Sequence, residues 1–468
     1  MTRTSRPADL APATSGRRRA WTAALCAASA AGLAALTVAG GPARAAPGAA
    51  PAPADAERAA CASAVAGPVT AAQVDSERRA AGTSRRVTCL SRWSPGTAST
   101  TAQQQRALAQ ARRQAQAAAT ASPSASKPKS KTKTTPAPGG GDALPLPKKG
   151  LRPADIAEIY ALDATKGAGA TVAIVVAYDN PQVEADLAVY RATFGLAPCT
   201  TANGCFTKVN QRGGATPPAA STGWALEIAL DTQAVSAACP RCKIILVEAD
   251  SDDLDDVGVA SRTAASLGAD VVSHSYGTAE FDGVLAYDAK YYSTSGVPNV
   301  VASGDHGYGA AFYPAVLPDA IAVGGTKVIK NKKGVWVHSA WVDASSGCSQ
   351  YVPQPAWQTV AACPMRATSD ISAVADTRTG LAVYSTYGYR GWVVVGGTSL
   401  SAPLVASMIA QSGEAASLTD ASPLYAATSG LLDVAKGSNG DCTSVLCKSR
   451  IGWDGPTGLG SPQGYSAF

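Results

Sequence analysis

The sequence predicts an α/β fold in which a doubly wound, mostly parallel sheet carries helices on both faces. Between residues 151 and 412, short continuous runs of Val and Ile alternate with longer segments of helical character. A strand that is apolar along its whole length is typical of a sheet covered on both sides. Alternation of such strands with helices is typical of parallel sheets, because a helix connects each strand to the next. The 45 glycines and 5 phenylalanines further predict a tightly packed core of small residues.

The expected elements follow one another in order from residue 151. The apolar, β-branched runs predict strands at 171–177, 243–248, 270–273, 297–302 and 320–323. The remaining periodic segments predict helices at 151–161, 183–194, 222–238, 254–267, 281–293 and 399–412.

The segment 396–403, Gly-Gly-Thr-Ser-Leu-Ser-Ala-Pro, contains the candidate nucleophile. It follows the β-branched run 393–395 and leads into an apolar stretch, which predicts a strand, a tight glycine turn and a helix. A serine at the start of such a helix lies beside backbone N–H groups that can stabilise an oxyanion. Ser399 is therefore the candidate. Taken alone, the motif also fits a Gly-Thr-Ser turn that caps a helix and does nothing else.

A serine nucleophile needs a neighbouring base, which is most often a histidine oriented by an aspartate. The chain has three histidines, His274, His306 and His338. No histidine precedes His274 in the chain. Residues 223–233, which lie in the region before it, have the pattern of a helix. If the base is a histidine, His306 is the candidate, because it stands next to Asp305.

Two carboxyl groups in the helix expected at 222–238 offer a different base. Glu227 and Asp231 are four residues apart, so they project from one face of the helix. Like charges at this spacing repel, whereas a pair that shares one proton avoids the repulsion and becomes an acid/base unit suited to low pH. The alternative is a solvated acidic face. The apolar neighbours Trp224 and Ile228 argue against that alternative.

A third carboxyl group, Asp305, lies in the turn Ser-Gly-Asp-His-Gly at 303–307, directly after another β-branched run. In its protonated form a carboxylic acid can donate a hydrogen bond to a developing oxyanion. The alternative role is that of a turn aspartate bonded to its own backbone.

These motifs together resemble the sedolisin (serine-carboxyl peptidase) family. The motifs are Glu227-x-x-x-Asp231, Ser303-Gly304-Asp305-x-Gly307 and Gly397-Thr398-Ser399-x-Ser401-x-Pro403, in this order along the chain. The resemblance implies a subtilisin-like fold with a Ser-Glu-Asp triad. It assigns the role of nucleophile to Ser399 and the role of general base, and later general acid, to Glu227. Asp231 would be the partner that shares a proton with Glu227, and Asp305 would stabilise the oxyanion. Gly396 stands where the family usually has a serine.

The resemblance also implies a structural calcium site near the C-terminus. Its ligands would be the carboxylates of Asp433 and Asp454 and the backbone carbonyls of Val434 and Gly452. Oxygen ligands carried by loops suit a hard cation. Arg450 stands where the family usually has another glycine. The alternative is a glycine-rich turn that closes the domain.

Composition divides the chain into three parts. Lys and Arg outnumber Asp and Glu by 21 to 6 in residues 1–150, whereas the acidic residues dominate the rest by 28 to 19. Residues 1–45 have the basic, apolar and small-residue regions of a signal peptide, with an uncleaved membrane anchor as the alternative. Residues 46–144 are a low-complexity basic prosegment or linker that we expect to be largely disordered. The peptidase domain is expected at 145–468.

The cysteines support export. Without Cys26 of the signal, ten remain in pairs that are near in sequence: Cys61/Cys89, Cys199/Cys205, Cys239/Cys242, Cys348/Cys363 and Cys442/Cys447. An even number at such spacings favours disulfides in an exported protein. The alternative for the Cys-Pro-Arg-Cys segment at 239–242 is a redox or zinc motif.

We therefore expect an acid-active serine-carboxyl endopeptidase that hydrolyses proteins or peptides through an acyl-enzyme on Ser399. We expect it to be made as a zymogen, to be secreted into the extracellular space and to be a monomer. We expect no specific nucleic-acid partner and no stable membrane insertion after signal cleavage, although the basic stretch leaves a polyanionic polymer open as a partner. One alternative is a catalytically inactive binding module of the same fold at the cell surface. Another is a histidine-dependent enzyme that uses His306.

Overall fold

The computed structural model describes residues 63–64, 86–94, 146–294, 296–309 and 311–468. The expected signal peptide at 1–45 lies outside these residues, as does most of the expected prosegment at 46–144. Within the described ranges, no helix is both long enough and apolar enough to cross a membrane.

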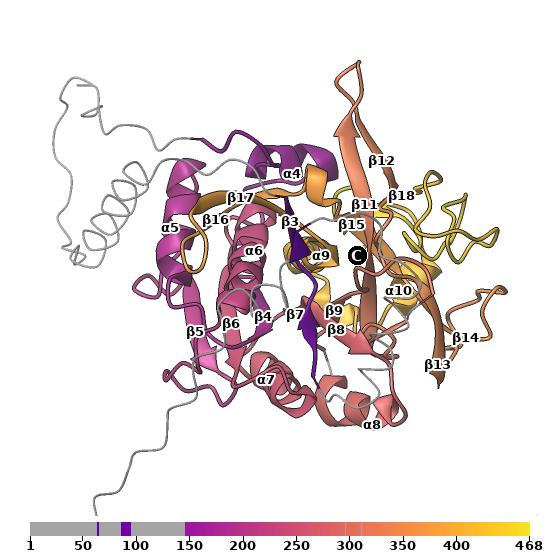
Figure 1. Cartoon of the computed structure of the whole chain (residues 1–468), viewed down its shortest axis with the longest axis horizontal. Helices are drawn as coiled ribbons and strands as arrows, with labels where there is room; N and C mark the ends of the chain where they lie inside the picture. The colour runs from indigo at the N-terminus through magenta and orange to yellow at the C-terminus, as the bar shows by residue number, and fades with distance from the viewer. Residues whose placement is uncertain (1–62, 65–85, 95–145, 295, 310) are drawn as a thin grey trace, which may run out of the picture. The chain divides into compact units, whose positions relative to one another are not determined.

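An eight-stranded sheet forms the centre of the domain (Figure 1), in the order β12-β11-β9-β7-β4-β6-β5 with β15 paired to β11. The strands are β4 (Thr171–Ala177), β5 (Phe206–Asn210), β6 (Lys243–Ala249), β7 (Val271–His274), β9 (Asn299–Ala302), β11 (Ala320–Lys330), β12 (Trp336–Ala340) and β15 (Ile371–Val374). Apart from the antiparallel pair of β11 and β12, these strands run parallel to their neighbours. The predicted α/β fold with a mostly parallel sheet is confirmed.

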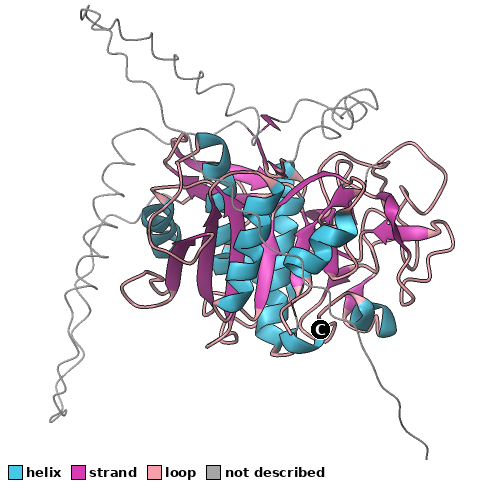
Figure 2. Ribbon diagram, turned by 90° about the horizontal axis from the view of Figure 1, so that it is seen from below, coloured by secondary structure: helices cyan, strands magenta, loops and turns pink. Residues whose placement is uncertain are grey.

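The strands are central because their sequences are apolar on both faces. All seven residues of β4 are buried, as a strand requires when elements pack on both of its sides. Figure 2 shows the magenta strands with cyan helices lying across them. The helices are α4 (Pro153–Tyr160), α5 (Val183–Thr193), α6 (Thr222–Ala238), α7 (Leu254–Ser266), α8 (Val284–Tyr287), α9 (Thr398–Ser412) and α10 (Ser422–Ala426).

Helices α6 and α9 pack against each other and against the sheet. Both are buried along nearly their whole length, which explains why their sequences are apolar all round and not amphipathic. The cap of α6 is Ser221, whose side chain accepts a hydrogen bond from the Trp224 N–H. The packing of α6 on α9 joins segments that are more than 150 residues apart in the chain.

Some elements differ from the sequence prediction. The helix expected at 281–293 is instead the short α8 followed by a π-helical turn, Asp288–Tyr292. The strand expected at 320–323 continues to Lys330, because its polar end pairs with β12 in a hairpin. Strand β5 was not predicted, since it lies at an edge of the sheet and its middle residues are partly exposed. An edge strand lacks the continuous apolar run by which the central strands are identified.

Residues 86–94 form two short strands, β2 (Thr88–Cys89) and β3 (Arg92–Ser94). Strand β2 pairs with β8 (Tyr276–Ala279), and β3 pairs with β17 (Gly391–Gly396), both antiparallel. In Figure 1, β3 is the indigo strand beside α9. These residues lie within the segment that composition predicts to be largely disordered, and they form two ordered strands within it. Their local sequence Val-Thr-Cys-Leu is apolar and β-branched, a signal that the average over residues 46–144 conceals.

Four of the five predicted disulfides are present: Cys199–Cys205, Cys239–Cys242, Cys348–Cys363 and Cys442–Cys447. In the fifth predicted pair, Cys89 is disulfide-bonded and Cys61 lies outside the described residues.

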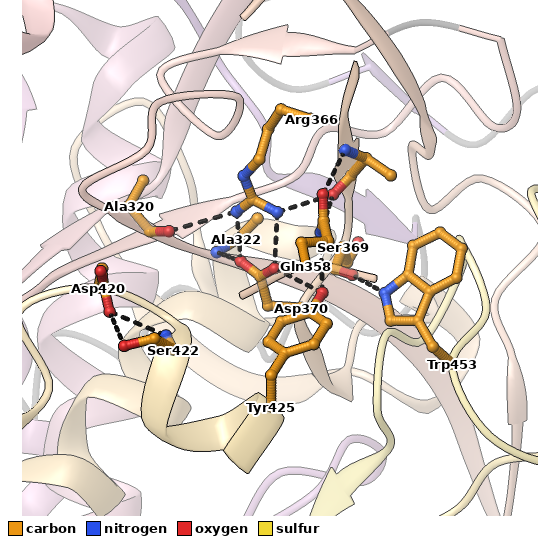
Figure 3. A network of polar contacts seen from close by, with 11 residues as sticks. Ala320, Ala322, Gln358, Arg366, Ser369, Asp370, Asp420, Ser422, Tyr425 and Trp453 are labelled. Atoms are coloured by element: carbon orange, nitrogen blue, oxygen red, sulfur yellow. Dashed lines mark hydrogen bonds and ion pairs between the residues drawn. The ribbon is translucent and has the colours of Figure 1, made fainter. Parts of the chain in front are cut away.

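A buried ion pair fixes the segment that leads into β15 (Figure 3). The guanidinium of Arg366 donates to both oxygens of Asp370, at 2.7 and 2.6 Å. Asp370 also accepts the Ala322 N–H of β11 at 2.8 Å and the Tyr425 hydroxyl of α10 at 3.0 Å. Because every partner of this carboxylate comes from a different element, the pair ties the sheet to the C-terminal part of the domain.

Candidate active site

The expected strand, turn and helix surround Ser399. Strand β17 ends at Gly396 and α9 begins at Thr398, with Gly397 between them at φ 106°. A Cβ atom on Gly397 would lie 2.6 Å from Oδ2 of Asp305. Glycine is therefore needed both for the left-handed backbone and for the close approach of Asp305.

The Ser399 hydroxyl contacts the predicted base. Its Oγ donates a hydrogen bond to Oε2 of Glu227 at 3.0 Å and lies 3.2 Å from the Ser275 carbonyl oxygen. Ser399 and Glu227 are both fully buried. The packing of α6 on α9 brings the two side chains together from positions 172 residues apart.

Glu227 and Asp231 lie one turn apart on α6, as predicted. Burial raises the pKa of Glu227 to about 8, although the hydrogen bond from Ser399 and the nearby hydroxyl and amide of Ser91 lower it. Burial and the charge of Glu227 together hold the pKa of Asp231 well above its usual value. One oxygen of each carboxyl group has no hydrogen-bond partner among the described residues. The pair can therefore hold a shared proton.

Asp305 belongs to the turn after β9, and its side chain contacts Thr398, the first residue of α9. Its Oδ1 accepts hydrogen bonds from the N–H and the hydroxyl of Thr398, each at 2.8 Å. Its Oδ2 has no hydrogen-bond partner among the described residues. Burial raises the pKa of Asp305 to about 6, and the nearby Arg92 opposes that rise. In mild acid Oδ2 can therefore carry a proton and act as a donor.

The three histidines have other partners. His274 is buried, and its ring nitrogens bond to the Tyr276 hydroxyl and to Asn299, both at 2.9 Å. The ring of His306 stacks on Phe312 at 5.0 Å, and His338 packs edge-on against Tyr160. Of the hydrogen bonds that the described residues make to the Ser399 hydroxyl, none comes from a histidine. The geometry favours Glu227 over His306 as the base.

Comparison with known proteins agrees with this geometry. The Subtilase family model, Peptidase_S8, matches residues 219–425, which contain all four candidate residues. Sedolisin of Pseudomonas sp. (strain 101) is 28% identical over 366 residues, which cover 67% of this chain and 60% of that protein. The solved structure of Pseudomonas sedolisin, a serine-carboxyl proteinase complexed with two molecules of pseudo-iodotyrostatin, is 26% identical with a TM-score of 0.59. The structural alignment covers 67% of this chain and 96% of the sedolisin chain. The chain is similar in sequence and in fold to sedolisin.

A second curated relative gives an alignment of similar length. Kumamolisin of Bacillus sp. (strain MN-32) is 27% identical over 358 residues, which cover 67% of this chain and 62% of that protein. The chain thus spans about 60% of the length of the curated sedolisins that it matches.

Sequence analysis missed two residues of the site. Ser275 donates its hydroxyl to Asp231 at 2.9 Å and thereby orients the second carboxyl group. It follows β7 directly, and the position after a strand of a parallel sheet was the available signal. Arg92 lies 3.8 Å from Oδ2 of Asp305 and 3.6 Å from Asp343. Nothing in the local sequence of Arg92 indicates that contact.

The residues of the expected calcium site lie in one C-terminal loop region. Asp433 accepts the Gly452 N–H at 2.8 Å, and its charge contributes to a raised pKa of about 7 for Asp454, of which burial is the main cause. The carbonyl oxygens of Val434 and Gly452 accept no hydrogen bond from a described residue. Two neighbouring carboxylates and two available carbonyls fit a hard cation. In the same ranges, no group of three or more His, Cys, Asp or Glu side chains has metal-binding geometry.

Arg450 does not obstruct this arrangement. Its backbone N–H donates to Oδ2 of Asp454 at 2.9 Å, and its guanidinium reaches the Thr443 carbonyl at 3.5 Å. The side chain that replaces the usual glycine is therefore accommodated on the loop itself.

Proposed function

We propose that this chain is a secreted, acid-active serine-carboxyl endopeptidase that hydrolyses proteins or peptides through an acyl-enzyme on Ser399. The observation that carries the proposal is the 3.0 Å hydrogen bond from the Ser399 hydroxyl to the buried carboxyl group of Glu227. A nucleophile in direct contact with a base is what covalent catalysis requires. The similarity to sedolisin and kumamolisin supports the class of reaction.

In the proposed reaction, Ser399 Oγ attacks the carbonyl carbon of the peptide while Glu227 accepts its proton, and at this step the proton shared by the pair is on Asp231. Protonated Glu227 then donates that proton to the leaving amine, and water releases the acyl group by the same steps in reverse. Asp231 shares a proton with Glu227, which keeps two buried like charges from forming side by side. Protonated Asp305 donates from Oδ2 to the oxyanion, together with backbone N–H groups at the start of α9.

Asp305 sets the upper limit of pH in this mechanism. Only its protonated form can donate, and its pKa of about 6 means that this form is present below that pH and lost above it. The Glu227–Asp231 pair keeps its shared proton to a higher pH, since the pKa of Glu227 is about 8. Activity is therefore expected to fall as the pH rises through about 6.

Hydrolysis of a denatured protein by wild type, Ser399→Ala and Ser407→Ala tests the proposal across this pH range. Ser407 is a matched control on the same helix, because its hydroxyl bonds to the Pro403 carbonyl at 2.7 Å within α9. We expect Ser399→Ala to lose at least about 10³-fold in kcat/KM, and Ser407→Ala to stay close to wild type. Unchanged hydrolysis by Ser399→Ala would refute the proposal. No turnover by pure wild type would favour the inactive binding module.

We also propose that Asp433, Val434, Gly452 and Asp454 bind a structural calcium ion. The two carboxylates and the available carbonyls described above support the site, and a cation there would favour the ionised form of Asp454, which burial and then the charge of Asp433 disfavour. Chelation of calcium should lower the thermal unfolding temperature of wild type. Asp433→Asn should reduce that response, and an equal response in the variant would contradict the assignment.

A further inference from the structure

We propose that the hairpin of β11 and β12 is a docking site for an anionic lipid bilayer. The hairpin comprises residues 327–339, with its turn at 331–334. Figure 1 shows β11 and β12 projecting beyond the helices and the other strands of the domain. This inference concerns residues that the proposed reaction does not use, and it does not depend on the proposed peptidase activity.

The hairpin concentrates positive charge in a domain that is acidic as a whole. Between residues 151 and 468, Asp and Glu outnumber Lys and Arg by 28 to 19. Residues 327–339 contain no acidic residue and four lysines, which are Lys327, Lys330, Lys332 and Lys333. A local cluster of one sign attracts a surface of the opposite sign, even where the net charge of the domain does not.

One face of the hairpin packs on α4. His338 lies edge-on against Tyr160 of that helix. The Lys330 ammonium forms an ion pair with Glu158 of α4 at 2.8 Å and lies 4.6 Å from the centroid of the Trp336 ring. These contacts fix the hairpin to the domain, so a surface that binds the hairpin also holds the domain.

The opposite face of the hairpin is apolar and exposed. Ile329 pairs with Val337, and Val335 is two residues before Val337, so these three side chains share a face. The next pair along, Lys330 and Trp336, lies on the other face. Ile329 is 46% exposed and Val335 is 57% exposed. Exposed apolar side chains that gather on one face indicate an interaction surface.

The turn at the tip is ordered by its own hydrogen bonds. The Asn331 N–H donates to the Val335 carbonyl at 2.9 Å. The side-chain oxygen of Asn331 accepts the N–H groups of Lys333 and Val335, at 2.8 and 3.1 Å. Gly334 has φ 79°, which favours glycine. Lys332 and Lys333 are therefore presented on a fixed backbone, which reduces the entropy that binding would cost.

Lysines beside exposed apolar side chains fit an anionic bilayer better than other partners. The ammonium groups are attracted to lipid phosphates, while apolar neighbours enter the boundary between head groups and acyl chains. A hydrated polyanion would engage the lysines but leave Ile329 and Val335 in water. A second copy of the chain would bring like charges together, which opposes association through this face. Binding of this kind is peripheral and requires no membrane-spanning segment.

The test measures partition of the full chain onto vesicles of equal parts phosphatidylglycerol and phosphatidylcholine, with pure phosphatidylcholine as the neutral comparison. Lys332→Gln combined with Lys333→Gln should lower the partition coefficient at least about tenfold, since each lysine near such a surface contributes about fivefold. The matched control combines Arg241→Gln with Lys243→Gln. These exposed cations lie at the start of β6, toward the other end of the sheet from β12. The control should bind as wild type does, because charges farther than a Debye length from the bilayer are screened.

Val335→Ser tests the apolar contribution without a change in charge. We expect it to weaken binding to the anionic vesicles at least about threefold, because less apolar area then leaves water. Leu285→Ser is the matched control, since Leu285 is 42% exposed on α8, and it should bind as wild type does. Soluble polyphosphate is the probe for a polymer, and Val335→Ser should not change its binding.

Three results would overturn the inference. The first is equal binding of wild type to anionic and neutral vesicles, or equal losses in the two double variants. The second is vesicle binding that Val335→Ser leaves unchanged while polyphosphate binding depends on Lys332 and Lys333, which would identify a hydrated polyanion as the partner. The third is a concentration-dependent mass of wild type that Val335→Ser abolishes, which would assign the face to a second copy.

The measurements keep this inference separate from the proposed function. Equal unfolding temperatures of wild type and the variants show that the variants are folded. Hydrolysis of a soluble denatured protein should be the same in all of them, because none of these residues belongs to the catalytic site. A wild type that binds the anionic vesicles as described but hydrolyses nothing would refute the peptidase proposal and support this one.

Discussion

Two buried acidic clusters of this protein differ in how their charge is balanced. Asp370 forms a two-point ion pair with Arg366, and both side chains have 0% exposure. Glu227 and Asp231 are buried to the same degree, yet among the described residues their close polar partners are the serines Ser399 and Ser275. In the first cluster a cation lies beside the carboxylate. The second raises its pKa values and holds protons instead.

This difference shows how one domain uses buried acids for structure and for chemistry. A carboxylate paired with a guanidinium and bonded to several elements suits a joint between β11, the start of β15 and α10. An uncompensated pair changes its protonation state at accessible pH, which suits an acid and base. As a consequence, ionisation of these two buried carboxyl groups lowers the stability of the folded state.

The largest expected effect comes from removing the acid/base function of the uncompensated pair. Glu227→Gln should lower kcat/KM at least about 10³-fold, because Ser399 then lacks a group that accepts its proton. Glu248→Gln is the matched control, since Glu248 is also buried but lies 3.3 Å from Lys208 on β6 and β5. Hydrolysis of a denatured protein in acid is the measurement. Comparable losses in both variants would show that the effect comes from folding and not from catalysis.

Breaking the compensated pair should affect stability and not the chemistry. Arg366→Met leaves Asp370 buried without its cation and should reduce the free energy of unfolding by about 3–5 kcal/mol. Arg212→Met removes the exposed ion pair with Asp250, in which Arg212 is 60% exposed, and should cost less than about 1 kcal/mol. Denaturant unfolding at constant pH measures both values. A loss for Arg366→Met no larger than for Arg212→Met would contradict the comparison.

The uncompensated pair should also make stability depend on pH. Because the pKa of Glu227 is raised from 4.5 to about 8, the folded protein binds its proton more tightly than the unfolded chain does. Its contribution to stability is therefore complete below about pH 4.5 and is lost as the pH rises toward 8. Asp231→Asn should flatten this decline in unfolding temperature. An unchanged slope in the variant would show that other groups dominate.

Asp305 offers a test of the oxyanion role. Asp305→Asn keeps an acceptor for Thr398 and places a permanent donor where the acid must be protonated. We expect reduced activity without the decline near pH 6, whereas Asp305→Ala should lose about 10²–10³-fold at every pH. The pH profile of kcat/KM for the two variants is the measurement. If Asp305→Asn keeps the wild-type decline, another group sets that limit.

The smallest expected effect concerns Arg92. Since Arg92 lowers the pKa of Asp305, Arg92→Gln should move the upper pH limit of protein hydrolysis to higher pH, by less than about one unit. The limit is read from the pH profile of kcat/KM on a denatured protein. Arg86→Gln is the control, because Arg86 lies in the same segment and pairs with Asp252 at 3.5 Å. A shift to lower pH for Arg92→Gln would reverse the sign of this interaction.

Much of the fold was predictable because the central elements carry continuous local signals. The bounds of β4 and α6 match the prediction at both ends, and α9 begins within one residue of it. The sequence prediction missed the edge strand β5 and the strand β12, and it gave β11 too short. The reason is that polar residues of these segments are partly exposed. Strands β2 and β3 were hidden in a segment whose average composition predicts disorder.

By itself, the sequence determined which residues are candidates for the chemistry. Glycines before Ser399, a four-residue spacing from Glu227 to Asp231, and a glycine turn at Asp305 are local features that any reader of the chain can find. Tertiary structure alone decided that these groups meet, that Ser275 and Arg92 join them, and that residues 86–94 lie across the site. The physical reason is that a pKa, a hydrogen bond and a bound strand depend on distance and burial. Both are set by segments far apart in the chain, whose packing no local pattern records.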